Sequence, residues 1–396
     1  MQSTIESGAS EPPLLPAHDT AARLGIKLDT LYAYVSRGLI RSVAVPGSRE
    51  RRYRAEDVER LRLGRGAERG REPLIPVIDS AICLIANGRF YYRGVDALRL
   101  ADSATLEEVA ALLWESAAPS HPSSAPPPAP ARQRDMPGGL IERCQVRLAM
   151  LGAADLAALD LSRGGIVRSG WAILNELAGV TAGATGDGAH GEAPAHRRLA
   201  ARWRLDPAGA DLVRRCLVLL ADHELNASAF VARCVASTGA TPYAVVAAAL
   251  GALSGRRHGG ASARAEALFR EIGPDSDPLA VMAARLVRGE ELPGLGQPLY
   301  PDGDPRARAI IAAIARARPE AGRRIAAAAA AATRLSGQHP NVDFALGAVT
   351  SALDLPAGSA LGLFLVARTA GWIAHAIEQY DSGVLIRPRA RYIGKR

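Results

Sequence analysis

Two residues of this chain have the types and settings that enolisation of a carbonyl compound needs. His258 is followed by Gly259, Gly260 and a helical pattern, so it is expected at a helix N-terminus, where the dipole favours neutral imidazole. A neutral imidazole can donate a hydrogen bond to a developing oxyanion, and the glycines let a ligand approach closely. Asp343 precedes an apolar helical run, so desolvation should raise the pKa of its carboxyl and make it a candidate general base. Each residue also has a structural interpretation, as a packing histidine and as a helix cap.

Cationic and loop residues close to this pair suggest an anionic substrate. The loop "GLGQPLYPDGDPRA", residues 294–307, combines glycines and prolines with Gln297 and Arg306. Guanidinium groups match carboxylates in a two-pronged geometry. The arginines that could provide such contacts are Arg306, Arg368, Arg387 and Arg389.

The elements that must position these residues are predicted to be helices. Alanine and leucine dominate the apolar content and aromatic residues make up only 5%, a composition that favours packed helices over sheets. At 396 residues the chain exceeds the usual size of one core. A second domain is expected over 67–396. From about residue 72 its pattern is helix after helix, with polar islands between, and we expect a small lobe at about 255–345. A Pro/Ser/Ala-rich stretch near 118–135 is expected to be a surface insertion.

Residues 1–66 have a different pattern. A short helix, a turn at Gly25, a second helix capped by Asp29, a basic hairpin and a further helix are predicted. This order resembles a small winged helix-turn-helix of the MerR or excisionase type, a resemblance that covers about 50 residues. Such a module would place its second helix in the major groove and its wing on phosphates. The groove-side candidates are Thr30, Tyr34 and Arg37, and the phosphate candidates are Arg49, Arg51 and Arg52. A solvated or protein-docking face is the alternative.

Charge and cysteine content indicate which partners and which compartment to expect for this protein. The net charge is +8, and the first 71 residues hold 13 basic and 9 acidic side chains, which is half of that excess. The four cysteines lie far apart without a CxxC pair, so we expect no metal site and free thiols in the cytoplasm. Apolar runs such as 326–332 fall short of the roughly 20 residues that cross a bilayer. No basic-then-apolar secretion signal is expected at the N-terminus.

The islands "ADHELNAS", "HGGA", "YPDGDPRA", "PNVDF" and "RTAGWIAH", in this order, resemble the citrate synthase family, including methylcitrate synthases. The resemblance extends from "YYRGVDALRL" to "IRPRARYIG", most of about 325 residues. It implies an all-helical, two-lobed fold. It also implies condensation of acetyl-CoA with oxaloacetate or a related 2-oxo acid to give citrate and CoA, with acetyl-CoA as substrate and no tightly bound cofactor.

The resemblance also implies roles for single residues. His258 would hold the thioester carbonyl of acetyl-CoA, and Asp343 would remove a methyl proton. His223, Arg306 and Arg368 would bind oxaloacetate. Arg387 would reach across a dimer interface, which makes a homodimer the minimal active unit.

Three positions depart from the family pattern. Leu220 stands where a histidine often precedes "ADHE", which implies little beyond an altered substrate. Gln297 replaces the histidine that meets the keto oxygen of oxaloacetate. Its amide can donate a hydrogen bond but cannot deliver a proton, so reduced activity is expected. Pro298 replaces an arginine associated with CoA binding. Three functions therefore stay open: a citrate synthase-type acyltransferase, a ligand-sensing DNA-binding regulator, and a non-catalytic partner subunit.

Overall fold

The computed structural model divides into two compact units, residues 1–79 and 80–396. It describes residues 14–26, 28–36, 40–45, 50–55, 57–58, 78–117, 138–183, 193–390 and 392–394. The predicted boundary at 66/67 and the Pro-rich insertion at 118–135 fall outside the described residues. Arg37 and Arg49, two of the DNA-contact candidates, also fall outside them.

The first unit is a small α/β module. Its three-stranded antiparallel sheet has the order β1-β3-β2 and packs with two helices around a core that includes Leu31, Ile40 and Tyr53. Helix α2 begins at Leu28, one position before the predicted cap Asp29, so Asp29 lies inside the helix. The elements are β1 (Leu14–Pro16), α1 (Ala17–Leu24), α2 (Leu28–Ser36), β2 (Ser42–Ala44) and β3 (Arg51–Arg54).

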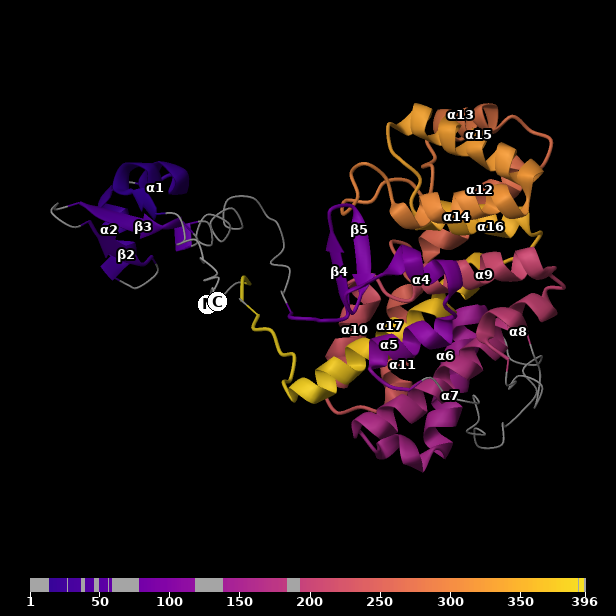
Figure 1. Ribbon diagram of the computed structural model, residues 1–396, viewed down its shortest axis with the longest axis horizontal. Coiled ribbons are helices and arrows are strands. Elements are labelled where there is room, and N and C mark those ends of the chain that lie inside the picture. Colours follow the sequence, from indigo (N-terminus) through magenta and orange to yellow (C-terminus); the bar gives the residue numbers. More distant parts are fainter. Residues whose placement is uncertain are drawn as a thin grey trace, which may run out of the picture. The chain divides into compact units, whose positions relative to one another are not determined.

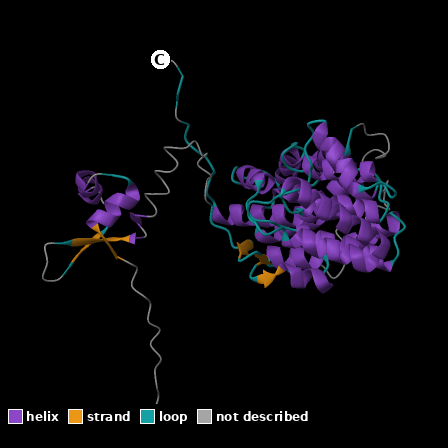
Figure 2. Ribbon diagram, turned by 90° about the horizontal axis from the view of Figure 1, so that it is seen from above, coloured by secondary structure: helices purple, strands orange, loops and turns teal. Residues whose placement is uncertain are grey.

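The second unit is almost entirely helical, which confirms the predicted fold class (Figures 1 and 2). Its strands form one small antiparallel sheet of order β4-β5-β6. The elements up to the first polar islands are β4 (Cys83–Ala86), β5 (Arg89–Tyr92), β6 (Val95–Asp96), α4 (Ala97–Ser103), α5 (Leu106–Trp114), α6 (Leu140–Ala154), a 3-10 turn (Leu156–Leu159), α7 (Arg163–Ala182), α8 (Ala195–Arg202), α9 (Pro207–Leu220), α10 (Ala227–Ala236) and α11 (Pro242–Leu253).

Five further helices pack chiefly on one another and gather at one end of this unit (Figure 1). They are α12 (Gly260–Ile272), α13 (Pro278–Val287), α14 (Pro305–Ala317), α15 (Pro319–Ser336) and α16 (Val342–Ala352). We propose this group as the small lobe expected at about 255–345. Several helices begin with proline, which is tolerated in the first turn because the amide there has no intrahelical partner. These prolines are Pro207, Pro242, Pro278, Pro305 and Pro319.

The long helix α17 (Ser359–Ser382) forms the centre of the second unit. It contacts α5, α7, α9, α10 and α11, and it also touches α12 and α16 of the five-helix group. Its length and mean hydropathy would suffice to cross a membrane, but 94% of the apolar window is buried inside the fold. The helix is therefore apolar on all sides because other helices surround it.

Candidate active site

A tight turn before α12 positions His258. The amide of His258 donates to the carbonyl of Gly255 at 2.9 Å, and the amide of Gly259 donates to the carbonyl of Leu253 at 2.9 Å. A Cβ at position 259 would lie 2.5 Å from that Leu253 oxygen, so only glycine fits there. The His258 ring is partly buried and meets the ring of Phe364 edge-on, with centroids 5.7 Å apart. The backbone and α17 together hold the imidazole in place.

The hydroxyl of Ser228 holds the inner nitrogen of that imidazole. Ser228 Oγ lies 2.8 Å from His258 Nε2, and it accepts a hydrogen bond from Trp372 Nε1 at 3.1 Å. Its single proton has two acceptors within 2.8 Å, His258 Nε2 and Asn226 Oδ1. When Ser228 donates to His258, the ring proton lies on Nδ1, which can then donate to a ligand.

The charge state of His258 suits that role. Burial, and secondly the Arg368 guanidinium, lower the pKa of His258 to about 4, so the imidazole is neutral near pH 7. The sequence suggested the helix dipole as the reason. In the structure burial is the main cause.

Asp343 lies in the first turn of α16. Asn341 caps this helix, because its Oδ1 accepts from the amides of Asp343 at 2.9 Å and Phe344 at 3.4 Å. The hydroxyl of Ser262, on α12, donates to Asp343 Oδ1. Burial raises the pKa of the Asp343 carboxyl, an effect opposed by the Ser262 hydrogen bond. Since α12 and α16 pack closely, they bring the His258 turn and Asp343 to the same part of the fold.

The loop that contains Gln297 is joined to the segment preceding Asp343. Leu295 and Pro340 form a β-bridge, and Asn341 Nδ2 donates to the carbonyl of Gly296 at 2.9 Å. Gly294 has φ +80°, and a Cβ there would lie 2.6 Å from the amide nitrogen of Phe344. Glycine at 294 therefore lets this loop lie directly against the start of α16.

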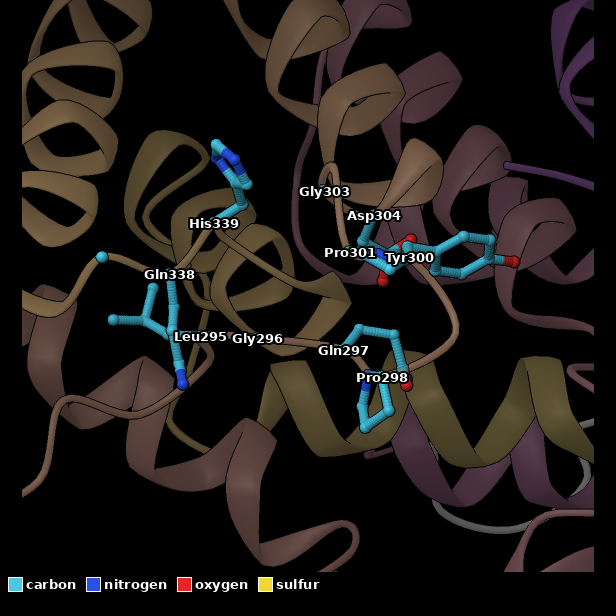
Figure 3. Close-up of a pocket in the computed structure, with 11 residues that line it drawn as sticks. Leu295, Gly296, Gln297, Pro298, Tyr300, Pro301, Gly303, Asp304, Gln338 and His339 are labelled. Atoms are coloured by element: carbon cyan, nitrogen blue, oxygen red, sulfur yellow. The ribbon is translucent and has the colours of Figure 1, made fainter. Parts of the chain in front are cut away.

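These two segments enclose a cavity of about 460 Å³ (Figure 3). Gln297 and Pro298 lie on one side of it and His339 on another, while the Tyr300 ring points away from His339. The side chain of Gln297 turns back on its own loop, with Oε1 accepting from the amide of Leu299 at 3.4 Å. The amide nitrogen of Gln297 is thus the part left to meet a ligand.

A buried cluster contains the predicted substrate residues His223, Arg306 and Arg368. His223 Nε2 lies 2.9 Å from the hydroxyl of Tyr300. The Arg306 guanidinium lies 5.9 Å from the centroid of the same Tyr300 ring. Burial, followed by the charges of Arg306 and Arg368, holds the pKa of His223 well below its usual value. The structure thus assembles two cations and a neutral imidazole, which suits a ligand with carboxylates.

The two arginines are held differently. Arg306 forms a two-pronged ion pair with Asp304, with Nη2 to Oδ2 at 2.7 Å and Nε to Oδ1 at 3.0 Å. Arg368 donates from Nε to the carbonyl of Leu220 at 2.8 Å and lies over the ring of Phe364, 4.7 Å from its centroid. The outer nitrogens of Arg368 are therefore the better placed to receive a carboxylate, while Arg306 has an internal partner already.

One face of α17 holds the loop that contains His223. Along this face Arg368 donates to Leu220, the amide of Gly371 donates to the carbonyl of Ala221 at 3.0 Å, and Trp372 donates to Ser228. A Cβ at position 371 would come within 2.4 Å of Asp222 Oδ1, so glycine permits this close approach. A single helix therefore aligns both the His223 cluster and the Ser228–His258 pair.

The other predicted residues lie elsewhere. Arg387 and Arg389 are exposed on the segment after α17 and are not brought to the His223 cluster of their own chain. In the first unit Arg51 and Arg52 are exposed on β3, Thr30 is partly buried, and Tyr34 packs against the core. The exposed aromatic residue of α2 is Tyr32, at 52%, which the sequence pattern did not single out.

Sequence reasoning also missed three supporting residues, which are Ser228, Ser262 and Asp304. A weak signal existed for two of them. Ser262 lies four residues after His258, and Asp304 lies two residues before Arg306 in a proline-rich loop. The pairing of Ser228 with His258 and of Ser262 with Asp343 spans 30 and 81 residues, which no local pattern reports.

Comparison with known proteins places these residues in a wider context. A family model described as the C-terminal domain of citrate synthase matches residues 181–389, and one described as a MerR helix-turn-helix regulatory protein matches residues 16–66. The "Putative citrate synthase 2" of Mycobacterium tuberculosis is 38% identical over 206 residues, covering 50% of this chain and 55% of that protein. The chain thus spans about half the length of the relatives it matches.

Two solved structures resemble most of this chain. The citrate synthase of Thermotoga maritima is 25% identical, with a TM-score of 0.65 over 83% of this chain and 96% of that one. The enzyme of Thermoplasma acidophilum, solved with carboxymethyl coenzyme A and oxaloacetate, is 22% identical with a TM-score of 0.67, again over 83% and 96%. At 22% identity, the resemblance to the Thermoplasma acidophilum structure shows a shared fold alone.

Proposed function

The chain belongs to the citrate synthase family, and from that premise we propose that it condenses acetyl-CoA with oxaloacetate or a related 2-oxo acid, releasing citrate or its homologue and free CoA. The observation that carries the proposal is the pairing of a neutral His258 with an Asp343 of raised pKa beside a buried cluster of two arginines and a histidine. A neutral donor and a basic carboxylate are the two groups that enolisation requires.

The proposed first step is the formation of an enol. Asp343 removes a proton from the methyl group of acetyl-CoA, while His258 Nδ1 donates a hydrogen bond to the thioester oxygen. In this step Ser228 donates to Nε2 rather than to Asn226 Oδ1, which keeps the ring proton on the outward nitrogen Nδ1. Ser262, by donating to Asp343, orients the carboxylate without neutralising it.

Carbon–carbon bond formation follows. The enol carbon attacks the keto carbon of the oxo acid, whose carboxylates are held by the His223, Arg306 and Arg368 cluster, and the keto oxygen takes up a proton. Water then attacks the thioester, so that citrate and the CoA thiol leave. The amide of Gln297 can stabilise the keto oxygen by a hydrogen bond, but that oxygen must take its proton from elsewhere. We therefore propose a slower enzyme than one with a histidine at 297.

A homodimer is part of the proposal. Arg387 is exposed on the C-terminal segment of its own chain, and the family resemblance assigns such an arginine to the neighbouring subunit's site. The four cysteines are free thiols, which suits work in the cytoplasm. DNA binding by the first unit is likewise proposed, on the basis of the match to the MerR family model and the exposed Arg51 and Arg52.

The test measures release of CoA thiol from acetyl-CoA, with and without oxaloacetate, at high protein concentration. Oxaloacetate-dependent release that disappears in Asp343→Asn is the expected result. Release that is independent of oxaloacetate, or none above a blank, would contradict the proposal. Propionyl-CoA and other 2-oxo acids in the same assay would define the substrate.

The specific observation favouring a second function is the combination of Gln297 with a MerR-type module. In that case the second unit would bind oxaloacetate or CoA without turnover, and the bound ligand would alter DNA affinity. A gel-shift titration with and without both ligands separates the two functions, because an enzyme with an independent DNA module would show no ligand effect.

A further inference from the structure

Three arginines surround the turn that holds His258. Arg256 and Arg257 directly precede it, and Arg264 lies one turn into α12. All three are exposed. Arg264 Nη1 donates to the backbone carbonyl of Arg256 at 2.7 Å, so the two ends of this cluster lie side by side. Arg264 lies on α12 two residues after Ser262, whose hydroxyl donates to Asp343 Oδ1, so it belongs to the end of the helix that contacts the candidate base.

The charges of these three arginines are not neutralised within the described structure, where none of the three forms an ion pair. Two arginines at the end of α13, the half-buried Arg285 and the exposed Arg288, behave differently. Arg285 and Arg288 both pair with Glu271 and with Glu290. A cluster of three cations costs free energy through mutual repulsion, so an anion from outside is the natural partner.

The cavity next to the site offers no cation of its own. The residues lining it come from 295–304 and 337–339, and none of them is an arginine or lysine. Pro298 and Pro301 occupy this wall, and the Arg308 guanidinium is bonded to the carbonyl of Asp302. An acyl-CoA has a diphosphate and a 3′-phosphate, and these groups need cationic or amide donors somewhere near the thioester site.

We propose that Arg256, Arg257 and Arg264 bind the phosphate groups of the acyl carrier, with its flexible arm folded back toward the His258 turn. This inference rests on the proposed function and names the part of the site that recognises CoA. Arginine suits the role because its planar fork can hold two phosphate oxygens at once. Positive charge on the 256–264 turn would thereby replace the charge missing from the loop that contains Pro298.

The experiment is calorimetric titration of the full-length protein with free CoA, which needs no turnover. Arg256→Ser/Arg257→Ser is expected to raise the Kd for CoA about tenfold, since each charge-assisted contact contributes a few-fold in affinity. Arg256→Lys/Arg257→Lys should retain most of the affinity. Arg323→Ser, at an exposed arginine on α15, is the matched control and should change nothing. Pantetheine, which lacks phosphate, should bind wild type and the serine variant equally.

The outcomes separate this inference from the function. Unchanged CoA affinity in the serine variant, together with oxaloacetate-dependent thiol release by wild type, would overturn the arginine assignment and leave the function standing. A loss of affinity that appears equally with pantetheine would show a general disturbance of the site and would also overturn it. If wild type binds no CoA and releases no thiol, both proposals fail. If wild type and the serine variant bind 3′-dephospho-CoA with the same Kd, the tenfold difference seen with CoA comes from contacts with the 3′-phosphate.

Discussion

The imidazole Nε2 of His375 lies 3.2 Å from Asp222 Oδ1, and both side chains are almost completely buried. In the described structure neither His375 Nε2 nor Asp222 Oδ1 has another hydrogen-bond partner, so these two atoms are each other's polar neighbour. On the far side of the ring, Arg233 Nε donates to His375 Nδ1 at 3.0 Å, which assigns the ring proton to Nε2, facing the carboxylate. This chain of three side chains supports the loop that holds His223.

Asp222 Oδ2 accepts from the amide of Glu224 at 3.0 Å, and Glu224 has a left-handed φ of 57°. His375→Gln should therefore loosen this loop and raise the KM for oxaloacetate about tenfold, with a smaller effect on kcat. His196→Gln, at a buried histidine on α8, is the control and should leave the KM unchanged. Equal loss of kcat and stability, without a change in KM, would show that His375 only supports packing.

Asp343→Asn should remove activity and at the same time stabilise the protein. The pKa of Asp343 is higher in the folded protein than in the unfolded chain. The protonated carboxyl therefore stabilises the fold at pH values below the unfolded pKa, and this stabilisation is lost as the pH rises through the folded pKa. At pH 7 the ionised carboxylate therefore costs stability, and asparagine can still accept from Ser262. We expect a Tm higher by about 2–4 °C at pH 7 and a smaller gain at pH 4. The exposed Asp275→Asn should change neither activity nor Tm. A lower Tm for Asp343→Asn would refute this view.

Gln297→His should raise kcat about 10- to 100-fold, because a histidine can deliver the proton that the glutamine amide cannot. Gln338→His adds a histidine to the lining of the same cavity and should have little effect. The measurement is initial thiol release at saturating substrates. Slower turnover in Gln297→His would mean that the loop is adapted to glutamine.

Stability should fall as the pH decreases from about 6.5 to about 4. Burial lowers the pKa of His258 in the folded protein to about 4, whereas its unfolded pKa is 6.5. The neutral imidazole therefore contributes its full stabilisation of the fold above pH 6.5, and this stabilisation is lost as the pH falls towards 4. The shift corresponds to at most on the order of 3 kcal/mol. His258→Gln should flatten the dependence of the unfolding free energy on pH, measured by urea titration. An identical slope in variant and wild type would contradict this.

DNA binding by the first unit should depend on Arg51 and Arg52. Arg51→Ala/Arg52→Ala is expected to weaken binding and to reduce the slope of log K against log salt concentration by about 2, one unit for each phosphate that is no longer neutralised. Arg23→Ala, on the exposed end of α1, should leave the slope unchanged. DNA binding that is unaffected by substitution of Arg51, Arg52 and Arg23 would indicate that the face with Arg51 and Arg52 binds a protein partner instead.

Composition and periodicity by themselves determined the fold class of this protein. A high content of alanine and leucine with few aromatic residues favours packed helices, and the structure confirms that expectation. The order of the polar islands identified the family, and the helix-turn-helix pattern identified the first unit as a MerR-type module. His258 and Asp343 were selected in the same way, from residue type and local surroundings.

Only the tertiary structure decided how these residues are supported. The contacts of Ser228 with His258, of Ser262 with Asp343 and of Arg368 with Leu220 join residues 30, 81 and 148 positions apart. Local pattern cannot report such pairs, because they depend on how α10, α12, α16 and α17 pack. The same packing made burial, rather than the helix dipole, the main reason for a neutral His258. It also left Arg387 exposed and away from the His223 cluster of its own chain, because the segment after α17 runs outside the helical core.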